Sequence, residues 1–468
     1  MFTLSDNSKV RTCRGISRRD FLTIGSLALG GLSLPQLLQA QSEGRRPMVK
    51  DKSVVFLFLQ GGPTQIETFD PKMSAPVEIR SITGEVQTRL PGVTFGGTFP
   101  KLAAMADKLA IVRSFASGNA DHQNYVSVAG GNELRVPMGT LYSRVAGTNH
   151  PRTGIPTNVI LPAEAVIQNF RFPSYFETEA LQKLVRTSQN LGASYSYFDP
   201  SGGGELRQNL ELHMPRGRLT DRRNLLQQLD TFRRQVDETR AFDNINAYEQ
   251  QAYELLLRGV AGAFDLSRED PRVLARYDTG GMFNMAELHR WGDMRRSSNL
   301  LGKQMLLARR LCENGCGFVT VMDAGWDMHS NNNSPRNLGG IHWLGPQVDH
   351  AVSAFLEDVE ARGLSDKILL VVTGEMGRTP RIGREGGRDH WANLTPLLIA
   401  GGGLRMGQVI GQSDRQAGTP ATDRYTPQHL LATIMQVVFD TAEVRLAPGL
   451  PRDVERTVTG GTAIRELF

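Results

Sequence analysis

The stretch Ser53-Val-Val-Phe-Leu-Phe-Leu59, followed by Gln60-Gly-Gly-Pro63, decides the fold class. A run of hydrophobic residues without polar alternation is typical of a strand that is buried on both faces, as in parallel sheets. The glycines and the proline end the strand, because they favour turns over extended structure. The segment therefore predicts a central strand of an α/β protein.

Other segments repeat this pattern along the chain. Short hydrophobic runs predict further strands at residues 109–113, 159–161, 317–322, 368–373 and 396–400. Helices are predicted at 100–108, at 348–362 where Gly363 ends the helix, and from Thr426-Pro427 onward, while the polar segment of about 206–311 is predicted to be a helical excursion. Strands that alternate with helices predict a mostly parallel central sheet with helices on both faces. We expect one domain over residues 41–468.

The N-terminal segment has the features of a twin-arginine signal peptide. Arg18-Arg19 precede Phe21-Leu22, and a mildly hydrophobic stretch follows from Ile24 to Leu38. This stretch is shorter than the roughly 20 residues of a membrane span. We expect residues 1–40 to direct export by the twin-arginine machinery, and the rest of the chain to be periplasmic or secreted, without a membrane span.

Charge argues against a nucleic-acid partner. The formal net charge is +5, and residues 1–40 carry five basic and two acidic side chains, which leaves only +2 for the remainder. A basic patch is the usual electrostatic footprint of nucleic-acid binding. The remainder also has two cysteines, Cys312 and Cys316, which the spacing allows to be either a disulfide or two buried thiols.

Candidate functional residues follow the predicted strands in four clusters. The clusters are Gly61–Lys72, Asn119–Asn124, Asp323–Asn333 and Thr373–Trp391. In α/β folds, sites form at the carboxyl ends of the strands, so these clusters are predicted to meet at one edge of the sheet. Each cluster alone has a structural interpretation as well, and for His122 and His390 both interpretations stay open.

The residue types in these clusters suit a divalent cation. Carboxylates and imidazoles bind zinc, manganese or iron, and calcium where oxygen ligands dominate. A cation beside a Thr or Ser hydroxyl could activate a nucleophile or a water molecule for attack on a phosphoryl or sulfuryl group. Arg378 or Arg388 could bind the oxyanion through two parallel hydrogen bonds.

Taken together, the motifs resemble a known family. They are Arg18-Arg19 with Phe21-Leu22, Gly61-Gly62-Pro63 with Thr68-Phe69-Asp70-Pro71-Lys72, Gly325-Trp326-Asp327-x-His329, Gly374-Glu375-x-Gly377-Arg378-Thr379-Pro380 and Gly387-Arg388-Asp389-His390-Trp391. The chain resembles the uncharacterised bacterial family called domain of unknown function 1501 over essentially its whole length after the signal. That family is similar to a distant branch of the alkaline phosphatase and sulfatase superfamily.

The resemblance implies roles for particular residues. Asp327, His329 and His390 resemble the metal ligands of the superfamily, and Glu375 or Asp70 would complete the site. For the nucleophile, the best-placed hydroxyl is that of Thr64, with Ser114 and Ser117 as alternatives. The chain departs from the superfamily at Gln60, where an aspartate is usual, and at Met376, where a histidine is usual.

Two functions follow as hypotheses. The first is metal-dependent hydrolysis of phosphate or sulfate esters, with a small molecule or a polysaccharide as substrate and zinc, manganese or calcium as the cation. The second is a catalytically degenerate member of the fold that binds a ligand or a partner in the periplasm. The departures at Gln60 and Met376 favour the second hypothesis, and the retained acidic, histidine and arginine residues favour the first.

Overall fold

The computed structural model describes residues 2–3, 23–24, 47–123, 125–167, 191–202 and 260–468. The chain divides into two compact units, Met1–Pro47 and Met48–Phe468. In the first unit the described strands are β1 (Phe2–Thr3) and β2 (Thr23–Ile24), which pair antiparallel. The predicted signal peptide, residues 1–40, otherwise lies outside the described residues.

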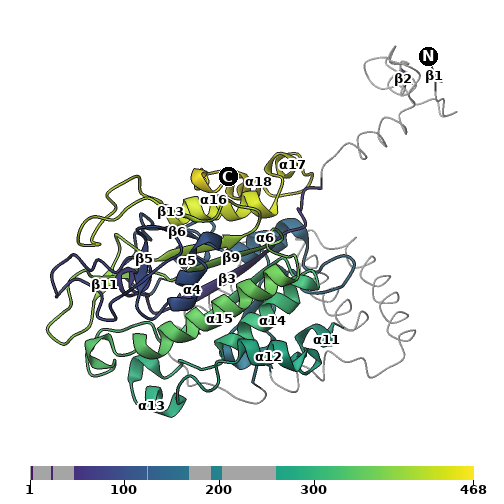
Figure 1. Ribbon diagram of the computed structural model, residues 1–468. Helices are drawn as coiled ribbons and strands as arrows, with labels where there is room; N and C mark the ends of the chain where they lie inside the picture. Colours follow the sequence, from purple (N-terminus) through teal and green to yellow (C-terminus); the bar gives the residue numbers. More distant parts are fainter. Residues whose placement is uncertain (1, 4–22, 25–46, 124, 168–190, 203–259) are drawn as a thin grey trace. The chain divides into compact units, whose positions relative to one another are not determined.

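A seven-stranded sheet forms the centre of the second unit (Figure 1). Its strand order is β13-β6-β12-β9-β3-β8-β7. The bounds of the strands are β3 Ser53–Gln60, β6 Ala110–Val112, β7 Asn158–Leu161, β8 Phe318–Ala324, β9 Ile368–Thr373, β12 Leu397–Gly401 and β13 Gln408–Ile410. The predicted hydrophobic runs therefore all form strands of one sheet, with β3 between β9 and β8 as a central strand.

Six of these strands run in one direction. β3 pairs parallel with both β8 and β9, β7 pairs parallel with β8, and β13 pairs parallel with β6. The exception is β12, which is antiparallel to β9 and to β6. The prediction of a mostly parallel sheet is confirmed, and the start of β12 lies at the edge where its neighbours end.

Alternate residues of β3 enter two different hydrophobic cores. Val55, Leu57 and Leu59 belong to one core, and Val54 and Phe56 belong to the other. All five are nearly inaccessible to solvent, which explains why the segment lacks polar alternation. Helices therefore cover both faces of the sheet, as the sequence predicts.

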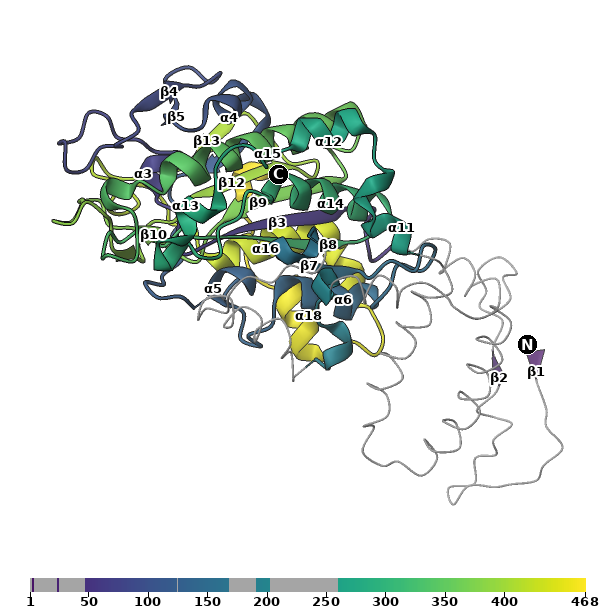
Figure 2. The same ribbon diagram turned by 90° about the horizontal axis from the view of Figure 1, so that it is seen from below.

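The helices of one face lie around α14 and α15, and those of the other face include α6 and α16 (Figures 1 and 2). The longer helices are α6 Met138–Ala146, α12 Pro271–Tyr277, α14 Leu301–Glu313, α15 Ile341–Ala361, α16 Pro427–Val438 and α18 Arg452–Thr459. The short ones are α3 Gln65–Thr68, α4 Pro100–Ala104, α5 Tyr125–Val128, α11 Ala261–Phe264, α13 Met285–His289 and α17 Thr441–Arg445.

α15 begins earlier than the sequence predicts. The expected start was residue 348, but the helix begins at Ile341 and contains Pro346. Proline lacks the N–H that a helix interior needs, which is why the pattern favoured a later start. Pro346 is the sixth residue of the helix and lies beyond the first turn, so the carbonyl oxygen of His342 receives no i→i+4 hydrogen bond from it.

The predicted helical excursion, about 206–311, is described only from residue 260 onward. That part contains α11, α12 and α13 and leads into α14, which packs against α15 and β8. Both cysteines lie at the end of this region; Cys312 and Cys316 are free and buried, and they do not form a disulfide. Within the described ranges, no helix has the length and hydrophobicity that crossing a membrane requires.

Two small ribbons complete the fold. β4 (Glu85–Gln87) pairs with β5 (Thr94–Gly96), and β10 (Gly377–Arg378) pairs with β11 (His390–Trp391). In the second ribbon Arg378 lies opposite His390. This pairing brings two candidate site residues together at the edge of the sheet where β9 ends and β12 begins.

Candidate metal centre

Loops from four places in the sequence meet at the carboxyl edge of the sheet. Asp327 follows β8, Glu375 follows β9, and His122 comes from the loop after β6. His390 lies on β11, shortly before β12 begins. The antiparallel direction of β12 explains this arrangement, because residues that precede β12 share an edge with residues that follow its neighbours.

Asp327 is the centre of the cluster. Its Oδ1 lies 2.8 Å from Nε2 of His329 and 3.2 Å from Nε2 of His390, and its Oδ2 lies 3.3 Å from Nε2 of His122. The two nitrogens of His329 and His390 are 2.9 Å apart. The ligand atoms of His122, Asp327 and His390 all lie within 4.8 Å of one another, a grouping that could hold a metal ion.

The other ring nitrogens face hydrogen-bond acceptors. Nδ1 of His122 lies 2.9 Å from Oε1 of Glu375, and Nδ1 of His390 lies 3.1 Å from the carbonyl oxygen of Ala120. A carbonyl oxygen can only accept, so Nδ1 of His390 carries the hydrogen, and its neutral ring presents a lone pair at Nε2. Such acceptors behind a histidine are typical of metal-binding imidazoles.

The third histidine has a similar arrangement. Nδ1 of His329 lies 3.3 Å from Oδ1 of Asp389, a side chain that is largely exposed. If the three histidines are neutral and carry their hydrogen on Nδ1, the lone pairs on their Nε2 atoms all point toward the carboxylate of Asp327. Since lone pairs and a carboxylate repel one another, this arrangement requires a cation or an additional proton between them.

The electrostatics of the cluster reflect this requirement. Burial opposes the charge on Asp327, but hydrogen bonds from the three histidines and the nearby Arg378 hold the pKa of its carboxyl far below the usual range. Burial also opposes the charge on His122, but its hydrogen bonds with Asp327 and Glu375 raise its pKa to about 10. In the absence of a metal, the contacts with these two carboxylates therefore favour the protonated form of His122.

Glu375 lies behind His122 and is completely buried. Its Oε1 accepts a hydrogen bond from the amide of Gly61, 2.9 Å away, in addition to its contact with His122. Its Oε2 is buried and has no hydrogen-bond partner among the described residues. Glu375 therefore orients His122, and one of its oxygens remains able to accept a further contact.

The guanidinium of Arg378 is also part of the cluster, and it is 99 % inaccessible to solvent. Nη2 contacts Oδ1 of Asp327, and Nη1 lies 3.3 Å from Nε2 of His329. The remaining donors of the group bond to main-chain carbonyls. Arg378 therefore pairs with Asp327, and it has no outward-facing donors for the substrate oxyanion that the sequence suggested.

Two glycines allow the loop after β3 to approach the cluster. Gly61 has φ +120°, and a Cβ atom there would lie 2.5 Å from the amide nitrogen of Asp327. A Cβ on Gly62 would lie 2.7 Å from the side chain of Met376 and 3.2 Å from Nε of Arg378. Neither position has room for a side chain, so the Gly-Gly pair is what lets the loop pack against Asp327 and Arg378.

Thr64 lies in the same loop, but its hydroxyl has a structural partner. Oγ1 of Thr64 accepts a hydrogen bond from the amide of Ile66, 3.3 Å away, and so caps α3. The side chain is 5 % exposed. Its suggested role as nucleophile remains a prediction, and so do the alternatives Ser114 and Ser117, which are both buried.

Arg388 points away from the cluster, although it is only two residues from His390. Its Nη2 lies 3.2 Å from Oε1 of Glu67, and both side chains are fully buried. Arg388 also donates to the carbonyl oxygens of Ile79 and Thr379. This buried ion pair connects the loop that contains His390 to α3. The contacts of Arg388 are therefore those of a residue that holds the loop in place.

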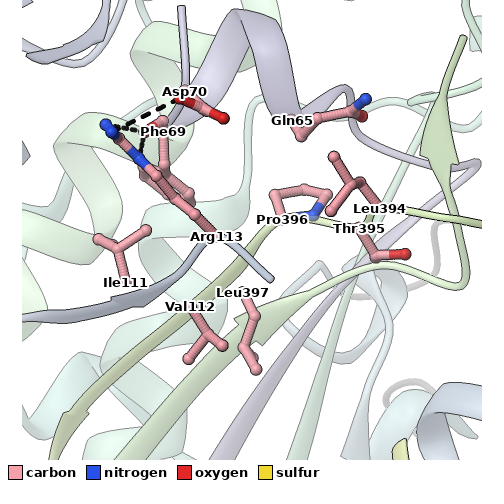
Figure 3. A pocket seen from close by; sticks show the side chains of 10 residues that line it. All are labelled: Gln65, Phe69, Asp70, Ile111, Val112, Arg113, Leu394, Thr395, Pro396 and Leu397. Carbon is pink, nitrogen blue, oxygen red and sulfur yellow. Dashed lines mark hydrogen bonds and ion pairs between the residues drawn. The ribbon is translucent and has the colours of Figure 1, made fainter. Parts of the chain in front are cut away.

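Asp70 lies in another environment as well. Its Oδ1 is 3.2 Å from Nζ of Lys72 and 3.5 Å from Nη1 of Arg113, and Oδ2 accepts from Ser413. Asp70 lines a small pocket with Arg113, Gln65 and residues at the start of β12 (Figure 3). The structure therefore brings Asp327, His329, His390 and Glu375 together and leaves Asp70 outside.

His122 is the residue that sequence reasoning did not include among the ligands. It lies in the Asn119–Asn124 cluster, which follows a predicted strand, but nothing in the sequence distinguishes it from a structural histidine. The only available signal was its position after a strand that ends at the same edge as the others. Met376, by contrast, is fully buried, and its side chain packs beside Gly62.

Fold and cluster together define an α/β protein with a candidate metal centre at the carboxyl edge of its sheet. The chain belongs to the family described as "Protein of unknown function (DUF1501)", whose sequence profile matches residues 51–468. The family membership expected from the motifs is confirmed. No curated protein matches the chain.

Several solved structures are similar to the chain at low identity. The PsFucS1 sulfatase from Pseudoalteromonas sp. is 12% identical over 81% of this chain and 67% of its own, with a TM-score of 0.33. The lipoteichoic acid synthase LtaP from Listeria monocytogenes is 8% identical over 83% and 72%, with a TM-score of 0.29. The phosphonate monoester hydrolase SpPMH from Silicibacter pomeroyi is 12% identical over 88% and 76%, with a TM-score of 0.29. Similarity at this level assigns no function to the chain.

Proposed function

We propose that this protein is an exported, metal-dependent hydrolase of phosphate or sulfate esters. The observation that carries the proposal is the orientation of three histidines, whose Nε2 atoms face the carboxylate of Asp327 while their Nδ1 atoms face acceptors. This arrangement is electrostatically favourable only around a positive charge. Arg378 supplies part of that charge at Oδ1 of Asp327, and a divalent metal would supply the rest.

The donor set fits a transition metal. Ligands about 2.0–2.2 Å from one ion lie roughly 3.4 Å apart in a tetrahedral arrangement. Oδ2 of Asp327 lies 3.3 Å from Nε2 of His122, and Oδ1 lies 3.2 Å from Nε2 of His390, so each ring is close to that spacing from a different oxygen of the carboxylate. Imidazole nitrogens suit zinc, the carboxylate of Asp327 also suits manganese, and calcium takes oxygen ligands almost exclusively. We therefore propose zinc or manganese in place of calcium.

His122, Asp327 and His390 would hold the ion, and a bound divalent metal would act there as a Lewis acid toward a phosphoryl or sulfuryl oxygen. Glu375 would keep the hydrogen of His122 on Nδ1, so that Nε2 stays available as a ligand. Arg378 would hold Oδ1 of Asp327 in position. His329 and His390 are the most exposed histidines of the group, and they mark the side from which a substrate would enter.

A second function has a specific observation in its favour. The hydroxyl of Thr64 caps a helix, the donors of Arg378 bond within the protein, and Arg388 is buried beside Glu67. In the described residues, each of these three suggested catalytic groups therefore has a structural partner. A protein that binds a metal or an anionic ligand without turnover, the degenerate member considered above, is the alternative that this observation favours.

Location and partners complete the proposal. We propose export through the twin-arginine machinery on the basis of Arg18-Arg19 and the hydrophobic stretch that follows. The mature chain would then work in the periplasm or outside the cell, on a small-molecule or polysaccharide ester. The low net charge of the mature chain gives no reason to propose a nucleic-acid partner.

Metal analysis and an ester screen test the proposal. The purified chain is loaded with Zn²⁺ or Mn²⁺, dialysed and analysed for bound metal, alongside the variants His390→Ala and Asp70→Asn. We expect His390→Ala to lose the metal and Asp70→Asn, a buried acid outside the cluster, to keep it. Aryl sulfates and aryl phosphates then serve as substrates, with and without a chelator. Metal content equal in all three proteins would overturn the metal site, and bound metal without hydrolysis would favour the non-catalytic alternative.

A further inference from the structure

We infer that the guanidinium of Arg378 is a built-in cation that limits this centre to one metal ion. The inference rests on the proposed metal site, and it concerns how many ions the site accepts. Arg378 is suited to this role because it is buried within the cluster and is held by contacts on every nitrogen of its guanidinium.

Main-chain carbonyls from three loops surround the guanidinium. Nε of Arg378 donates to the carbonyl oxygen of Gly62 at 2.8 Å, and Nη1 donates to that of Arg388 at 3.1 Å. Nη2 donates to the carbonyls of Gly61 and of Trp326, the latter at 3.4 Å. Carbonyl oxygens carry partial negative charge, so these loops form a cradle that favours a positive charge at this position.

The guanidinium also contacts two groups of the metal cluster. Nη2 contacts Oδ1 of Asp327, the oxygen that lies 2.8 Å from His329 and 3.2 Å from His390. Nη1 lies 3.3 Å from Nε2 of His329. A second metal ion beside the first would need these same atoms as ligands. Arg378 already occupies the space next to them.

Charge strengthens this effect. A guanidinium keeps its proton in proteins, so the charge of Arg378 is permanent. An additional divalent ion would lie within a few ångströms of that charge, where repulsion is strong in a buried site. Metals in two-metal sites lie about 3.5–4 Å apart. Neither the space nor the charge at Arg378 permits such a pair.

The surrounding chain is shaped to the guanidinium. A Cβ on Gly62 would lie 3.2 Å from Nε and 3.3 Å from Nη2 of Arg378. Gln65 adds two contacts with the main chain of Arg378, since its side chain accepts from the Arg378 amide at 3.0 Å and donates to the Arg378 carbonyl at 2.8 Å. Arg388 is the natural control, because it is also buried and multiply bonded but pairs with Glu67 and shares no acceptor with the cluster.

Metal stoichiometry tests the inference. The protein is loaded with Mn²⁺, and bound manganese is measured by elemental analysis and by electron paramagnetic resonance. We expect one ion per chain and the spectrum of an isolated Mn²⁺ ion. Replacing Arg378 with alanine opens the cradle, and we expect Arg378→Ala to take up a second ion whose spectrum couples to the first. Arg378→Lys keeps the charge and should bind one ion, and so should Arg388→Ala.

Each outcome decides the inference. Two coupled ions in the wild-type protein would overturn it, and so would a single ion in folded Arg378→Ala. If Arg378→Ala does not fold, two other results decide instead. They are the wild-type spectrum and the stoichiometry of Arg378→Met, which keeps an unbranched, uncharged side chain that ends short of the guanidinium position. Absence of bound manganese in the wild type would be a failure of the proposed metal site itself, which separates the two ideas.

Discussion

Nε2 of His122 lies 3.3 Å from Oδ2 of Asp327, although the two residues come from loops that follow different strands. Oδ1 of the same carboxylate faces His329 and His390, so Asp327 uses both oxygens within the cluster. On the other side of its ring, His122 contacts Glu375. Glu375, His122 and Asp327 therefore form a chain of contacts in which a change at one residue should affect the other two.

Replacing Glu375 with glutamine should weaken metal binding. Oε1 of Glu375 also accepts from the amide of Gly61, so glutamine keeps an oxygen toward Nδ1 of His122, but it removes the negative charge that raises the basicity of Nε2 as a ligand. Loss of such an orienting partner costs roughly 10- to 100-fold in metal affinity. Titration with Zn²⁺ or Mn²⁺ against a competing chelator measures the change. Asp70→Asn is the matched control, and an equal loss in both variants would contradict the role of Glu375.

Metal affinity should increase with pH because His122 must give up a proton. The pKa of His122 is raised to about 10 in the metal-free protein by its contacts with Asp327 and Glu375, despite burial. Between its ordinary value of 6.5 and about 10, the ring is protonated, so the metal displaces one proton. One displaced proton corresponds to about a tenfold gain in affinity per pH unit. Calorimetry in two buffers of different ionisation enthalpy counts the protons. Affinity that does not change between pH 7 and 9 would contradict this prediction.

Asp323 should lower the stability of the protein at neutral and alkaline pH. Complete burial raises the pKa of this carboxyl from 3.8 to about 7, although a hydrogen bond from Trp326 opposes the shift. A raised pKa means that stability is highest when the group is protonated and falls as pH rises from about 4 to about 7. The variant Asp323→Asn keeps an acceptor for Nε1 of Trp326 and never ionises.

We expect Asp323→Asn to be more stable than the wild type above pH 7, by at most about 4 kcal/mol. Urea unfolding at pH 5 and at pH 8 measures the difference. The advantage of the variant should be larger at pH 8, because only there is the wild-type carboxyl charged. If the variant and the wild type differ in free energy of unfolding by the same amount at both pH values, burial does not raise the pKa of Asp323.

Gly61→Ala should disrupt the loop that carries Asp327. The new Cβ would lie 2.5 Å from the amide nitrogen of Asp327, and φ is +120° at this position. Steric overlap and backbone strain together should cost about 2–5 kcal/mol of stability. Gly84 also has a positive φ, +75°, but has nothing within 4 Å, so Gly84→Ala isolates the backbone strain. Thermal unfolding compares the two variants, and an equal loss of stability would show that Gly61 has room for a methyl group.

The sequence predicted the strands better than their directions. Segments such as 53–60, 318–324 and 368–373 are continuous hydrophobic runs, and burial on both faces requires that pattern. The antiparallel direction of β12 was not predicted. A parallel connection needs a long crossover, usually with a helix, and the segment from Thr373 to Leu397 contains only the short ribbon of β10 and β11. The absence of a predicted helix between Thr373 and Leu397 was therefore the sequence signal that β12 runs antiparallel to β9.

The site was predicted in part for a similar reason. Asp327, His329 and Glu375 follow strands directly, so the sheet itself determines where they lie. Asp70 and Arg388 are separated from their nearest long strand by many residues of loop, and their positions depend on partners such as Arg113 and Glu67 that no local pattern reveals. Spacing along the chain therefore predicts the residues next to strands and not those held by distant ion pairs.

The residues that would bind the metal are dispersed between His122 and His390, across most of the described sheet. The loops after β6 and β8 and the strand β11 carry these residues, so an occupied site requires that these parts of the fold are in place. If Arg18-Arg19 direct the chain to a translocase that accepts only folded cargo, then the ion is chosen in the cytoplasm, by the metals available there. The protein would then cross the membrane with that ion bound, and the metals present outside the cytoplasm would not determine which ion it holds.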